Sequence, residues 1–323
     1  MHSIQYFQNI IKQEFAKQNF FGEPEELYNP IDYALSLGGK RIRPVLTLMA
    51  CELFDGDINE ALAPAMGLEI FHNFTLLHDD VMDKSPIRRG KPTIFKKWNT
   101  NTAILSGDAM LIQAYSHITK THINFLPDVL KIFNKTAIEV CEGQQYDMNY
   151  ETSENITIED YFKMIRLKTA VLIAACLKIG AIIGGASKID AENIYKFGEN
   201  IGIAFQLKDD LLDAFGDTLK FGKNTGNDIV TNKKTFLFLK AFELAKGDVL
   251  DDLKHSFLIK DENEKKINKV TEIYKKLNIQ EITEKEISYY YQKALTNLSA
   301  INVEDNRKKE LKNFAENLKK RDF

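Results

Sequence analysis

The amino-acid sequence predicts an all-α protein, a bundle of long helices. All seven prolines lie within the first 127 residues, so the 196 residues from 128 to 323 contain none, and proline is the residue that most often ends a helix. Apolar residues recur at spacings of three and four, as at Leu207, Leu211 and Phe215, which is the period of a helix that buries one face. No convincing alternation of apolar and polar residues occurs, so we expect no β-sheet.

The same periodicity places the helices in order along the chain. A proline stands near the start of the second helix, and a cluster of aspartates ends both the third and the seventh. We expect helices near residues 3–20, 43–54, 62–83, 101–120, 128–149, 158–184, 190–214, 233–246, 262–277, 281–299 and 305–320. Two longer linkers, 84–100 and 216–232, each follow an aspartate cluster and are rich in Gly, Lys, Asn or Arg. The other connections are short, and we expect a single domain over residues 1–323.

An apolar stretch and a Lys-rich segment are both expected to be structural parts of helices. Residues 170–186 are nearly all apolar, but the stretch contains Lys178 and is shorter than the roughly 20 residues that a bilayer requires, so a buried core helix is expected and no stable membrane insertion. The Lys-rich segment 260–276 alternates with Asp and Glu. Such alternation is typical of a solvated helix face, and we assign it no functional role.

Composition excludes several classes of protein. Lys and Arg number 43 against 46 Asp and Glu, for a net charge of −3, so nucleic acid is not an expected partner. The three cysteines are widely spaced within helical sequence, which favours reduced core thiols over a disulfide framework. Residues 1–20 carry Lys12, Glu14 and Lys17 and lack the features of a secretion signal. We therefore expect a cytoplasmic protein.

The central observation is a repeated aspartate pattern, D-D-x-x-D. It occurs at residues 79–83 and again at 209–213, each time at the carboxyl end of a long apolar helix. Residues four apart share one helix face, so the first and last aspartates of each cluster point together, while Asp80 and Asp210 lie about 100° around the helix. Carboxylates at the negative end of a helix repel one another and the helix dipole unless a cation is present. Oxygen-only ligands favour Mg²⁺ that also binds phosphates.

Basic segments accompany both clusters. Arg88-Arg89-Gly90-Lys91 follows the first, and the segments 222–228 and 233–235 follow the second. A third basic segment, Gly38-Gly39-Lys40-Arg41-Ile42-Arg43-Pro44, combines glycines that allow close backbone approach with a helix start. Arginines bind phosphate oxygens in bidentate fashion, so phosphate-bearing substrates are indicated.

With these motifs in order, the sequence resembles the trans-prenyltransferases, or polyprenyl diphosphate synthases. The resemblance rests on the segments 38–44, 77–83, 88–90 and 205–213, supported by 107–111, Gly143-Gln144, 168–170 and 223–235. It implies the isoprenoid synthase fold, in which one helical domain encloses a deep apolar cavity with the aspartate motifs at its mouth. It also implies a Mg-dependent, head-to-tail condensation of isopentenyl diphosphate with an allylic diphosphate, which elongates the chain in the E configuration.

The resemblance assigns roles to individual residues. Three Mg²⁺ ions would be held by Asp79, Asp83 and Asp209, with Asp80, Asp210 and Asp213 supporting them. The allylic diphosphate (dimethylallyl, geranyl or farnesyl) would be held by Arg88, Lys168, Lys223 and Lys233, and Thr169 and Gln206 would lie near the reacting carbon. Isopentenyl diphosphate would be held by Lys40, Arg43, His72 and Arg89. Lys168, Thr169, Gln206 and Arg88 are the expected catalytic residues, acting by ionisation, condensation and elimination with the released diphosphate as base.

Product length is expected to depend on Phe74 and Thr75, which lie about one turn below Asp79. An aromatic residue five positions before the first aspartate is similar to the short-chain synthases. The first motif also lacks a two-residue insertion. This combination of features is similar to archaeal-type geranylgeranyl synthases. We therefore expect a 20-carbon product, with farnesyl diphosphate as the alternative.

Two other classes of function share some of these motifs. A class I terpene cyclase also uses D-D-x-x-D with Mg²⁺, but its second metal motif is based on Asn, Ser and Glu, unlike residues 209–213. A non-catalytic subunit of a heteromeric synthase would typically have lost one motif or the cations Lys40, Arg43 and Arg89, and all are present. Family members are usually homodimers, so a homodimer is expected.

Overall fold

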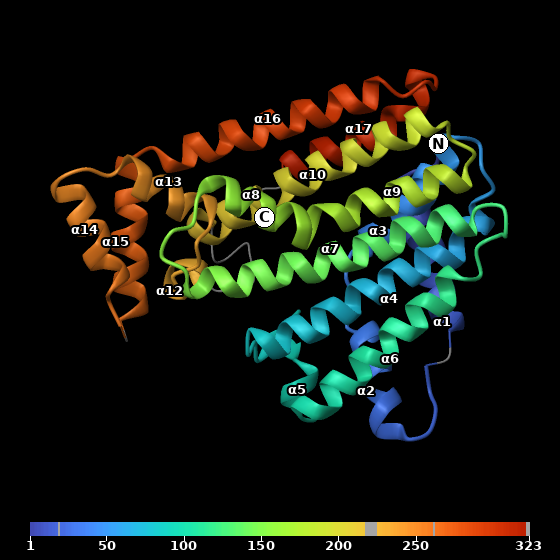
Figure 1. Cartoon of the computed structure of the whole chain (residues 1–323), viewed down its shortest axis with the longest axis horizontal. Coiled ribbons are helices and arrows are strands. Elements are labelled where there is room, and N and C mark those ends of the chain that lie inside the picture. Colours follow the sequence, from blue (N-terminus) through green and yellow to red (C-terminus); the bar gives the residue numbers. More distant parts are fainter. Residues whose placement is uncertain (19, 217–224, 261, 321–323) are drawn as a thin grey trace. The chain divides into compact units, whose positions relative to one another are not determined.

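The computed structural model describes residues 1–18, 20–216, 225–260 and 262–320. In these residues the chain is helical, with one two-stranded antiparallel sheet, which confirms the all-α prediction (Figure 1). The chain forms two compact units. One comprises Met1–Lys135, Ala175–Tyr195 and Ile301–Leu311, and the other Thr136–Ala174, Lys196–Ala300 and Lys312–Phe323. The single domain and the deep apolar cavity stay predictions.

The first unit is built around helix α4, Ile58–Met82, which packs along α6, Thr100–Ile118, and against α3, Ile42–Leu53. Asp57 caps the start of α4 by accepting a hydrogen bond from the backbone of Asn59 at 2.9 Å. Most of its residues between Ala61 and Leu77 are buried. A helix buried on nearly all sides carries the first aspartate motif at its carboxyl end.

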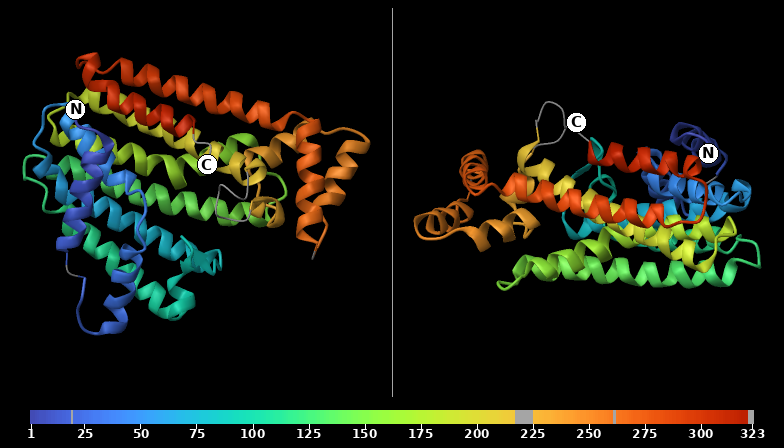
Figure 2. Two further views of the ribbon diagram at one scale, coloured as in Figure 1. Left: turned by 180° about the vertical axis from the view of Figure 1, so that it is seen from behind. Right: turned by 90° about the horizontal axis from the view of Figure 1, so that it is seen from above.

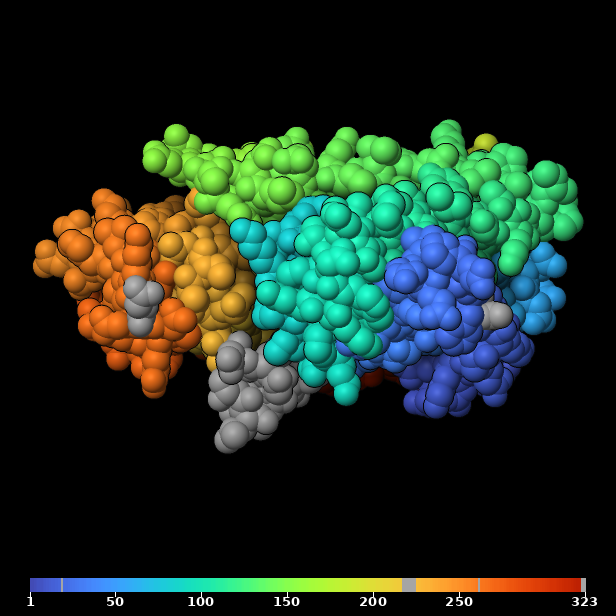
Figure 3. Space-filling view, turned by 90° about the horizontal axis from the view of Figure 1, so that it is seen from below, coloured from blue at the N-terminus to red at the C-terminus, as the bar shows by residue number. Residues whose placement is uncertain are grey.

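The sequence analysis missed two of the other helices of this unit, α2 and α5. Its N-terminal part contains α1, Ile4–Lys17; α2, Glu25–Ser36; α5, Ile94–Lys97; and the beginning of α7, Leu126–Thr152, and parts of three later helices also belong to it. Helix α2 contains Pro30, which removes one hydrogen bond, and the sequence therefore gave no reason to expect it. Pro30, Ile31, Ala34 and Leu35 are buried and α2 packs on α6, so tertiary packing overrides the local preference. Figure 3 shows the N-terminal segment beside α5 and α6 on one face of this unit.

The linker expected over residues 84–100 contains the short sheet. Strands β1, Ile87–Arg88, and β2, Lys91–Pro92, pair antiparallel, with Arg88 opposite Lys91. The two residues between them, Arg89 and Gly90, have φ of 52° and 73°. Positive φ at both central positions is the signature of a type I′ hairpin turn. The expectation of no β-structure was therefore wrong at this one turn, which is too short to show an alternating pattern.

The second unit contains most of the remaining helices, and Figure 2 shows α14 and α15 side by side at one end of it. Its buried core includes Tyr161, Leu207, Phe236 and Tyr274. The helices of the rest of the chain are α8, Ile158–Ile165; α9, Val171–Ile183; α10, Lys188–Phe215; α12, Asn227–Val230; α13, Phe236–Leu244; α14, Asp248–Phe257; α15, Asn263–Lys276; α16, Ile279–Ser299; and α17, Asp305–Lys319. Helices α12 and α14 were not expected from the sequence.

The helix expected over residues 158–184 is interrupted by one wide turn. Residues Arg166–Ala170 form a π-helical turn, η1, between α8 and α9. Such turns occur frequently at functional sites, because they insert an extra residue and reorient its neighbours. Gly143 packs directly on the turn, since a Cβ atom there would lie 2.3 Å from the backbone nitrogen of Lys168. The turn thereby presents two of the expected catalytic residues, Lys168 and Thr169.

The apolar stretch over 170–186 forms the buried helix α9, as predicted. Among the described residues, none of the helices has the length and apolarity needed to cross a membrane.

Candidate active site

The first aspartate motif lies where α4 ends. The backbone N–H of Asp83 donates to the carbonyl of Asp79 at 2.8 Å, which closes the last helical turn. Asp80 is 6% exposed and is turned into the protein. Burial raises the pKa of Asp80, and the guanidinium of Arg88 opposes that shift. The three carboxylates therefore differ in environment, and Asp80 is the one enclosed by protein.

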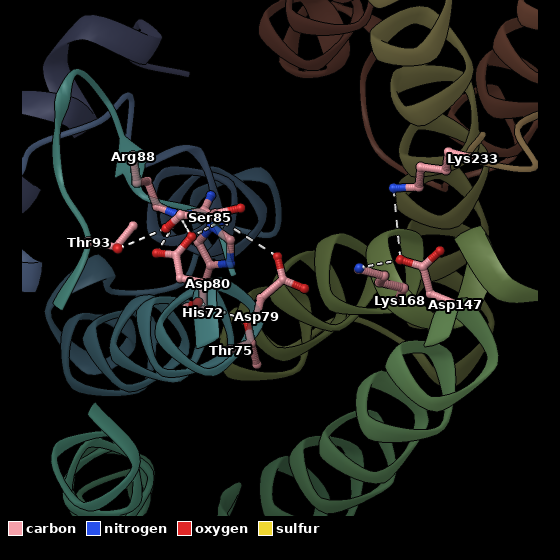
Figure 4. Close-up of polar contacts among 10 residues, drawn as sticks. All are labelled: His72, Thr75, Asp79, Asp80, Ser85, Arg88, Thr93, Asp147, Lys168 and Lys233. Carbon is pink, nitrogen blue, oxygen red and sulfur yellow. Dashed lines mark hydrogen bonds and ion pairs between the residues drawn. The ribbon is translucent and has the colours of Figure 1, made fainter. Parts of the chain in front are cut away.

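Arg88 on the hairpin holds Asp80 in a bidentate ion pair. Its Nε lies 2.8 and 2.9 Å from the two carboxylate oxygens, and a terminal nitrogen lies 2.7 Å from Oδ1. The same nitrogen is 3.5 Å from Oδ2 of Asp79 (Figure 4). The hairpin is fixed in turn by Thr93, whose hydroxyl donates to the carbonyl of Ser85 at 2.8 Å. Arg88 is thus placed beside the motif, as expected.

A second cationic group gathers in the same unit around His72. A terminal nitrogen of Arg43 lies 2.9 Å from Nε2 of His72. Burial, followed by the charges of Arg43 and Arg89, lowers the pKa of His72 well below its usual range. His72 is therefore neutral at physiological pH, and Nε2 accepts the hydrogen bond from Arg43.

Arg89 reaches this group from the hairpin turn. Its guanidinium donates to the carbonyl of Gly38. A Cβ atom on Gly39, whose φ is +129°, would lie 2.8 Å from Cζ of Arg89. The backbone conformation therefore favours glycine at residue 39, and a Cβ atom there would displace the Arg89 guanidinium.

Glu69 is a residue of this group that the sequence analysis missed. It lies one turn before His72 on α4 and is 4% exposed. Asn73 donates to its Oε1 at 3.3 Å, and burial raises its pKa while Arg43 opposes the shift. A charged residue within the mostly buried stretch from Ala61 to Leu77 was the available signal. Its carboxylate counterbalances the nearby arginines.

The second unit holds a different cationic group around Asp147 of α7. Nζ of Lys168 donates to Oδ2 of Asp147 at 2.6 Å, and Nζ of Lys233 lies 3.8 Å from the same oxygen (Figure 4). Burial acts to raise the pKa of Asp147, but Lys233 and Lys168 hold it below its usual value. The carboxylate thus joins two lysines that are 65 residues apart in the sequence. Asp147 was not among the expected site residues, although it follows Gly143-Gln144 closely.

The neighbouring Lys234 has a different task from Lys233. Its Nζ donates to the carbonyl of Tyr150 at 2.6 Å and to that of Glu151 at 3.2 Å. These are carbonyls at the carboxyl end of α7, which have no partners within the helix. Lys234 therefore ties the segment after α12 to α7 and leaves Lys233 directed at Asp147.

The second aspartate motif lies near the end of α10. Both oxygens of Asp210 accept hydrogen bonds, from Gln206 Nε2 at 2.9 Å and from the Tyr161 hydroxyl at 2.6 Å. Asp213 accepts a hydrogen bond from the backbone N–H of Asp228 at 2.9 Å. Burial, followed by the charge of Asp228, raises the pKa of Asp210 to about 7 and that of Asp213 to about 6. Excess negative charge in this region favours binding of a cation.

A polar pocket of the second unit collects several expected residues. It is lined by residues of α7, α8, the π-helical turn, α10 and the segment before α13. Its polar lining residues are Asp147, Tyr161, Lys168, Thr169, Gln206, Asp210, Lys233, Lys234 and Thr235. The hydroxyl of Thr169 donates to Oε1 of Gln206 at 3.0 Å. The pocket therefore combines three lysines and two carboxylates with neutral hydroxyl and amide groups.

Mg²⁺ fits the chemistry of these donors. Among the described residues, no three His, Cys, Asp or Glu side chains gather into a complete metal cage. Mg²⁺ typically takes only one or two protein carboxylates and completes its coordination with water and substrate phosphates. The carboxylates of each motif suit that partial role.

Comparison with known proteins identifies the family. Residues 24–277 match the model of the polyprenyl synthetase family. The chain belongs to this family. A geranylgeranyl diphosphate synthase of Methanosarcina mazei is 40% identical over 252 residues, or 77% of each chain. A short chain isoprenyl diphosphate synthase of Methanocaldococcus jannaschii is 37% identical over 84% of each chain.

Solved structures agree with the polyprenyl synthetase assignment. A crystal structure of a geranylgeranyl pyrophosphate synthase superposes with a TM-score of 0.95 and 42% identity, and covers 100% of both chains. The enzyme from Pyrococcus horikoshii gives a TM-score of 0.91 at 31% identity over 98% of both. The resemblance drawn from the motifs and the isoprenoid synthase fold are confirmed. The chain is a prenyltransferase.

Within this polyprenyl synthetase, the expected residues fall into groups that can be described separately. Arg43, His72 and Arg89 come together in the first unit, and Arg88 joins Asp79 and Asp80 there. In the second unit, Lys168 and Lys233 meet at Asp147, and Thr169 joins Gln206 and Asp210. Lys223 lies outside the described residues.

One structural interpretation of the sequence was wrong in part. Lys266, within the Lys-rich segment expected to be a solvated face, is 3% exposed. Its Nζ donates to the carbonyl of Val230 at 3.0 Å and to Oδ1 of Asn232 at 2.6 Å. The buried ammonium ties α15 to the segment that leads to Lys233. Charge alternation cannot distinguish one buried lysine among solvated ones.

Proposed function

We propose that the chain is a geranylgeranyl diphosphate synthase, which condenses isopentenyl diphosphate with an allylic diphosphate to a 20-carbon product. The observation that carries the proposal is the presence of two separate cationic groups. One is Arg43, His72 and Arg89, and the other is Lys168 and Lys233 at Asp147. A prenyl elongation needs two diphosphate sites, and relatives at about 40% identity carry this name.

The allylic diphosphate is assigned to Arg88, Lys168 and Lys233. Lys223 is added to them because of the family resemblance. Asp79, Asp83 and Asp209 would hold Mg²⁺, with Asp80, Asp210 and Asp213 supporting them, and three ions are proposed. When bound, Mg²⁺ neutralises charge that develops on the departing diphosphate. Asp80 keeps Arg88 extended beside the motif, where it can turn to phosphate oxygens.

Isopentenyl diphosphate is assigned to Lys40, Arg43, His72 and Arg89. The guanidinium groups bind its phosphate oxygens, and neutral His72 donates a hydrogen bond through its second ring nitrogen. No metal is needed there, since arginines supply the charge.

Catalysis then consists mainly of stabilising a leaving group. The allylic C–O bond breaks, and its electron pair leaves with the diphosphate held by Lys168, Lys233 and Arg88. Thr169 and Gln206 direct oxygen atoms toward the positive carbon. The alkene of isopentenyl diphosphate then forms the new C–C bond with the allylic carbon. The released diphosphate takes the proton that the condensed product loses, which restores a double bond.

Product length is assigned to the side chains below Asp79 on α4. Thr75 precedes Asp79 by one turn on the same face, and its hydroxyl donates to the carbonyl of His72 at 2.8 Å (Figure 4). Phe74 is 9% exposed and packs on Phe71 and His78, with ring centroids 5.6 and 4.8 Å apart. The small side chain of Thr75 thus lies below the motif and the aromatic ring of Phe74 lies beside it. This arrangement supports a 20-carbon product over a 15-carbon one.

The enzyme is further proposed to act as a homodimer in the cytoplasm. Leu105 and Ile112 lie two turns apart on α6 and are 60% and 67% exposed. Apolar side chains at this spacing form one stripe, which a second copy of the chain can cover.

Product analysis tests the proposed function. Purified protein is incubated with Mg²⁺, labelled isopentenyl diphosphate and, separately, dimethylallyl, geranyl or farnesyl diphosphate. We expect a dominant 20-carbon diphosphate. A 15-carbon product would contradict the assigned length, consumption of an allylic diphosphate alone would indicate a cyclase, and no incorporation with any primer would indicate a silent subunit.

A further inference from the structure

A chain of three hydrogen bonds crosses the polar pocket of the second unit. The Thr169 hydroxyl donates to Gln206 Oε1 at 3.0 Å, and Gln206 Nε2 donates to Asp210 Oδ1 at 2.9 Å. The other oxygen of Asp210 accepts the Tyr161 hydroxyl at 2.6 Å. Tyr161 is 1% exposed and Asp210 is 7% exposed, so the far end of the chain lies inside the protein core.

The elements that carry the chain explain its rigidity. Gln206 and Asp210 are four residues apart on α10 and therefore share one face. Tyr161 lies on α8, and its ring packs against Phe162 and Phe236 of the core, with centroids 5.6 and 6.4 Å away. Burial and the neighbouring Asp210 raise the pKa of Tyr161 well above its usual range, so its hydroxyl remains a donor.

Donor and acceptor chemistry determines which way the amide of Gln206 faces. In its ionised form Asp210 only accepts hydrogen bonds, so in that form the NH₂ group of Gln206 faces Asp210 and its carbonyl oxygen faces Thr169. The Thr169 hydroxyl then donates a hydrogen bond to that carbonyl. The oxygen lone pairs of Thr169 can therefore face the pocket.

We propose that Tyr161 is a positioning residue, which acts through Asp210 to fix the amide of Gln206 and thereby directs electron-rich oxygen toward the reacting carbon. This inference rests on the proposed function, in which Thr169 and Gln206 lie near that carbon. It assigns a task to a tyrosine outside both aspartate motifs. It also gives Asp210 a task distinct from that of its neighbour Asp209.

The test is a double-mutant cycle between Tyr161→Phe and Gln206→Ala. Tyr161→Phe removes only the hydroxyl, and we expect a fivefold to tenfold lower kcat with KM for both diphosphates within twofold of the wild type. In the Gln206→Ala background, which has its own lower kcat, the same change is expected to have almost no further effect, because the group that Tyr161 positions is gone.

Tyr274→Phe is the matched control, since Tyr274 is a tyrosine of the same core that is 2% exposed. It should leave kcat unchanged, and melting temperatures of all variants separate loss of stability from loss of rate. Equal effects of Tyr161→Phe in both backgrounds, or an effect on KM alone, would overturn the proposal.

If Tyr161→Phe does not fold, Asp210→Asn replaces it in the cycle. Tyr161 and Gln206 donate to different oxygens of Asp210, and asparagine has an NH₂ donor in place of one of them, so this variant should show the same dependence on Gln206. Independence would again overturn the proposal. Failure of the proposed function is distinguishable, because the wild type would then form no prenyl product. A wild-type kcat for Gln206→Ala in an active enzyme would overturn the positioning role itself.

Discussion

Arg89, one of the residues proposed to bind isopentenyl diphosphate, lies close to the backbone of Gly39. Arg89 adopts φ of 52° within the hairpin turn, a conformation that costs a non-glycine residue roughly 1–2 kcal/mol. Its guanidinium lies against Gly39, where a Cβ atom would be 2.8 Å from Cζ of Arg89. The position of the arginine side chain therefore depends on the absence of a side chain at residue 39.

Gly39→Ala is expected to displace the Arg89 guanidinium and to raise KM for isopentenyl diphosphate about tenfold, with KM for the allylic substrate unchanged. Steady-state kinetics with each substrate varied in turn measures this. Gly185→Ala is the control, because Gly185 has φ of +84° but open space around its Cα. It should cost about 1 kcal/mol of stability without moving either KM. Equal KM values for Gly39→Ala and the wild type would contradict the assigned role of Arg89.

Asp147 contacts Lys168 and Lys233, the two lysines proposed to bind the allylic diphosphate. Asp147→Asn removes the charge that holds Lys168 at 2.6 Å, and hydrogen bonds between charged groups contribute about 1.5–3 kcal/mol. We expect kcat/KM for the allylic diphosphate to fall roughly tenfold or more, while KM for isopentenyl diphosphate is unchanged. Glu192→Gln, which alters the more exposed ion pair with Lys178, serves as control. An allylic kcat/KM that did not change would show that the lysines need no such partner.

At the scale of elements, a buried ammonium joins α15 to the segment before α13. Lys266→Met leaves the carbonyl of Val230 and the amide of Asn232 without this donor. We expect a loss of about 2–3 kcal/mol in the free energy of unfolding, measured by chemical denaturation, and a lower kcat because Lys233 follows directly. Lys265→Met tests the neighbouring lysine, which is paired with Glu262 at the surface, and should cost less than about 0.5 kcal/mol. Equal losses for the two variants would refute the distinction.

Side chains of helix α4 are proposed to limit the length of the product. Thr75→Phe places an aromatic ring one turn below Asp79 on the same face, so the product should shorten to 15 carbons. Phe74→Ala should lengthen it beyond 20 carbons, since the ring that packs on Phe71 and His78 is removed. Mass analysis of the products reads both outcomes. An unchanged 20-carbon product from both variants would rule out these two residues as the floor of the cavity.

At the scale of the whole molecule, the exposed apolar stripe on α6 makes association with a second copy testable. Ile112→Glu introduces a charge into the proposed interface, and we expect the molar mass measured by light scattering to fall from that of a dimer toward the 37.0 kDa chain. Ile189→Glu is the control, because Ile189 is 74% exposed on α10. A dimer that persists in Ile112→Glu but is lost in Ile189→Glu would place the interface elsewhere.

The helical fold could be predicted from the sequence because its signals are local, and the same signals selected many of the residues that the structure brings into groups. Apolar spacing, the absence of proline after residue 127 and the two aspartate motifs can all be read within one segment. Other features depend on contacts that no segment contains. Helix α2 tolerates Pro30 only because of its packing on α6, and Asp147 gains its role from lysines on two other segments.

The hairpin at residues 87–92 has a further consequence. Its adjacent arginines reach different groups, Arg88 the carboxylates of α4 and Arg89 the backbone of Gly38. Because the two arginines are adjacent in the chain, a movement of the hairpin backbone shifts both of them, whereas rotation of one side chain does not. A substrate that moved the hairpin backbone on binding would alter affinity at the other diphosphate site, and thermodynamic reciprocity would make the factor equal in both directions.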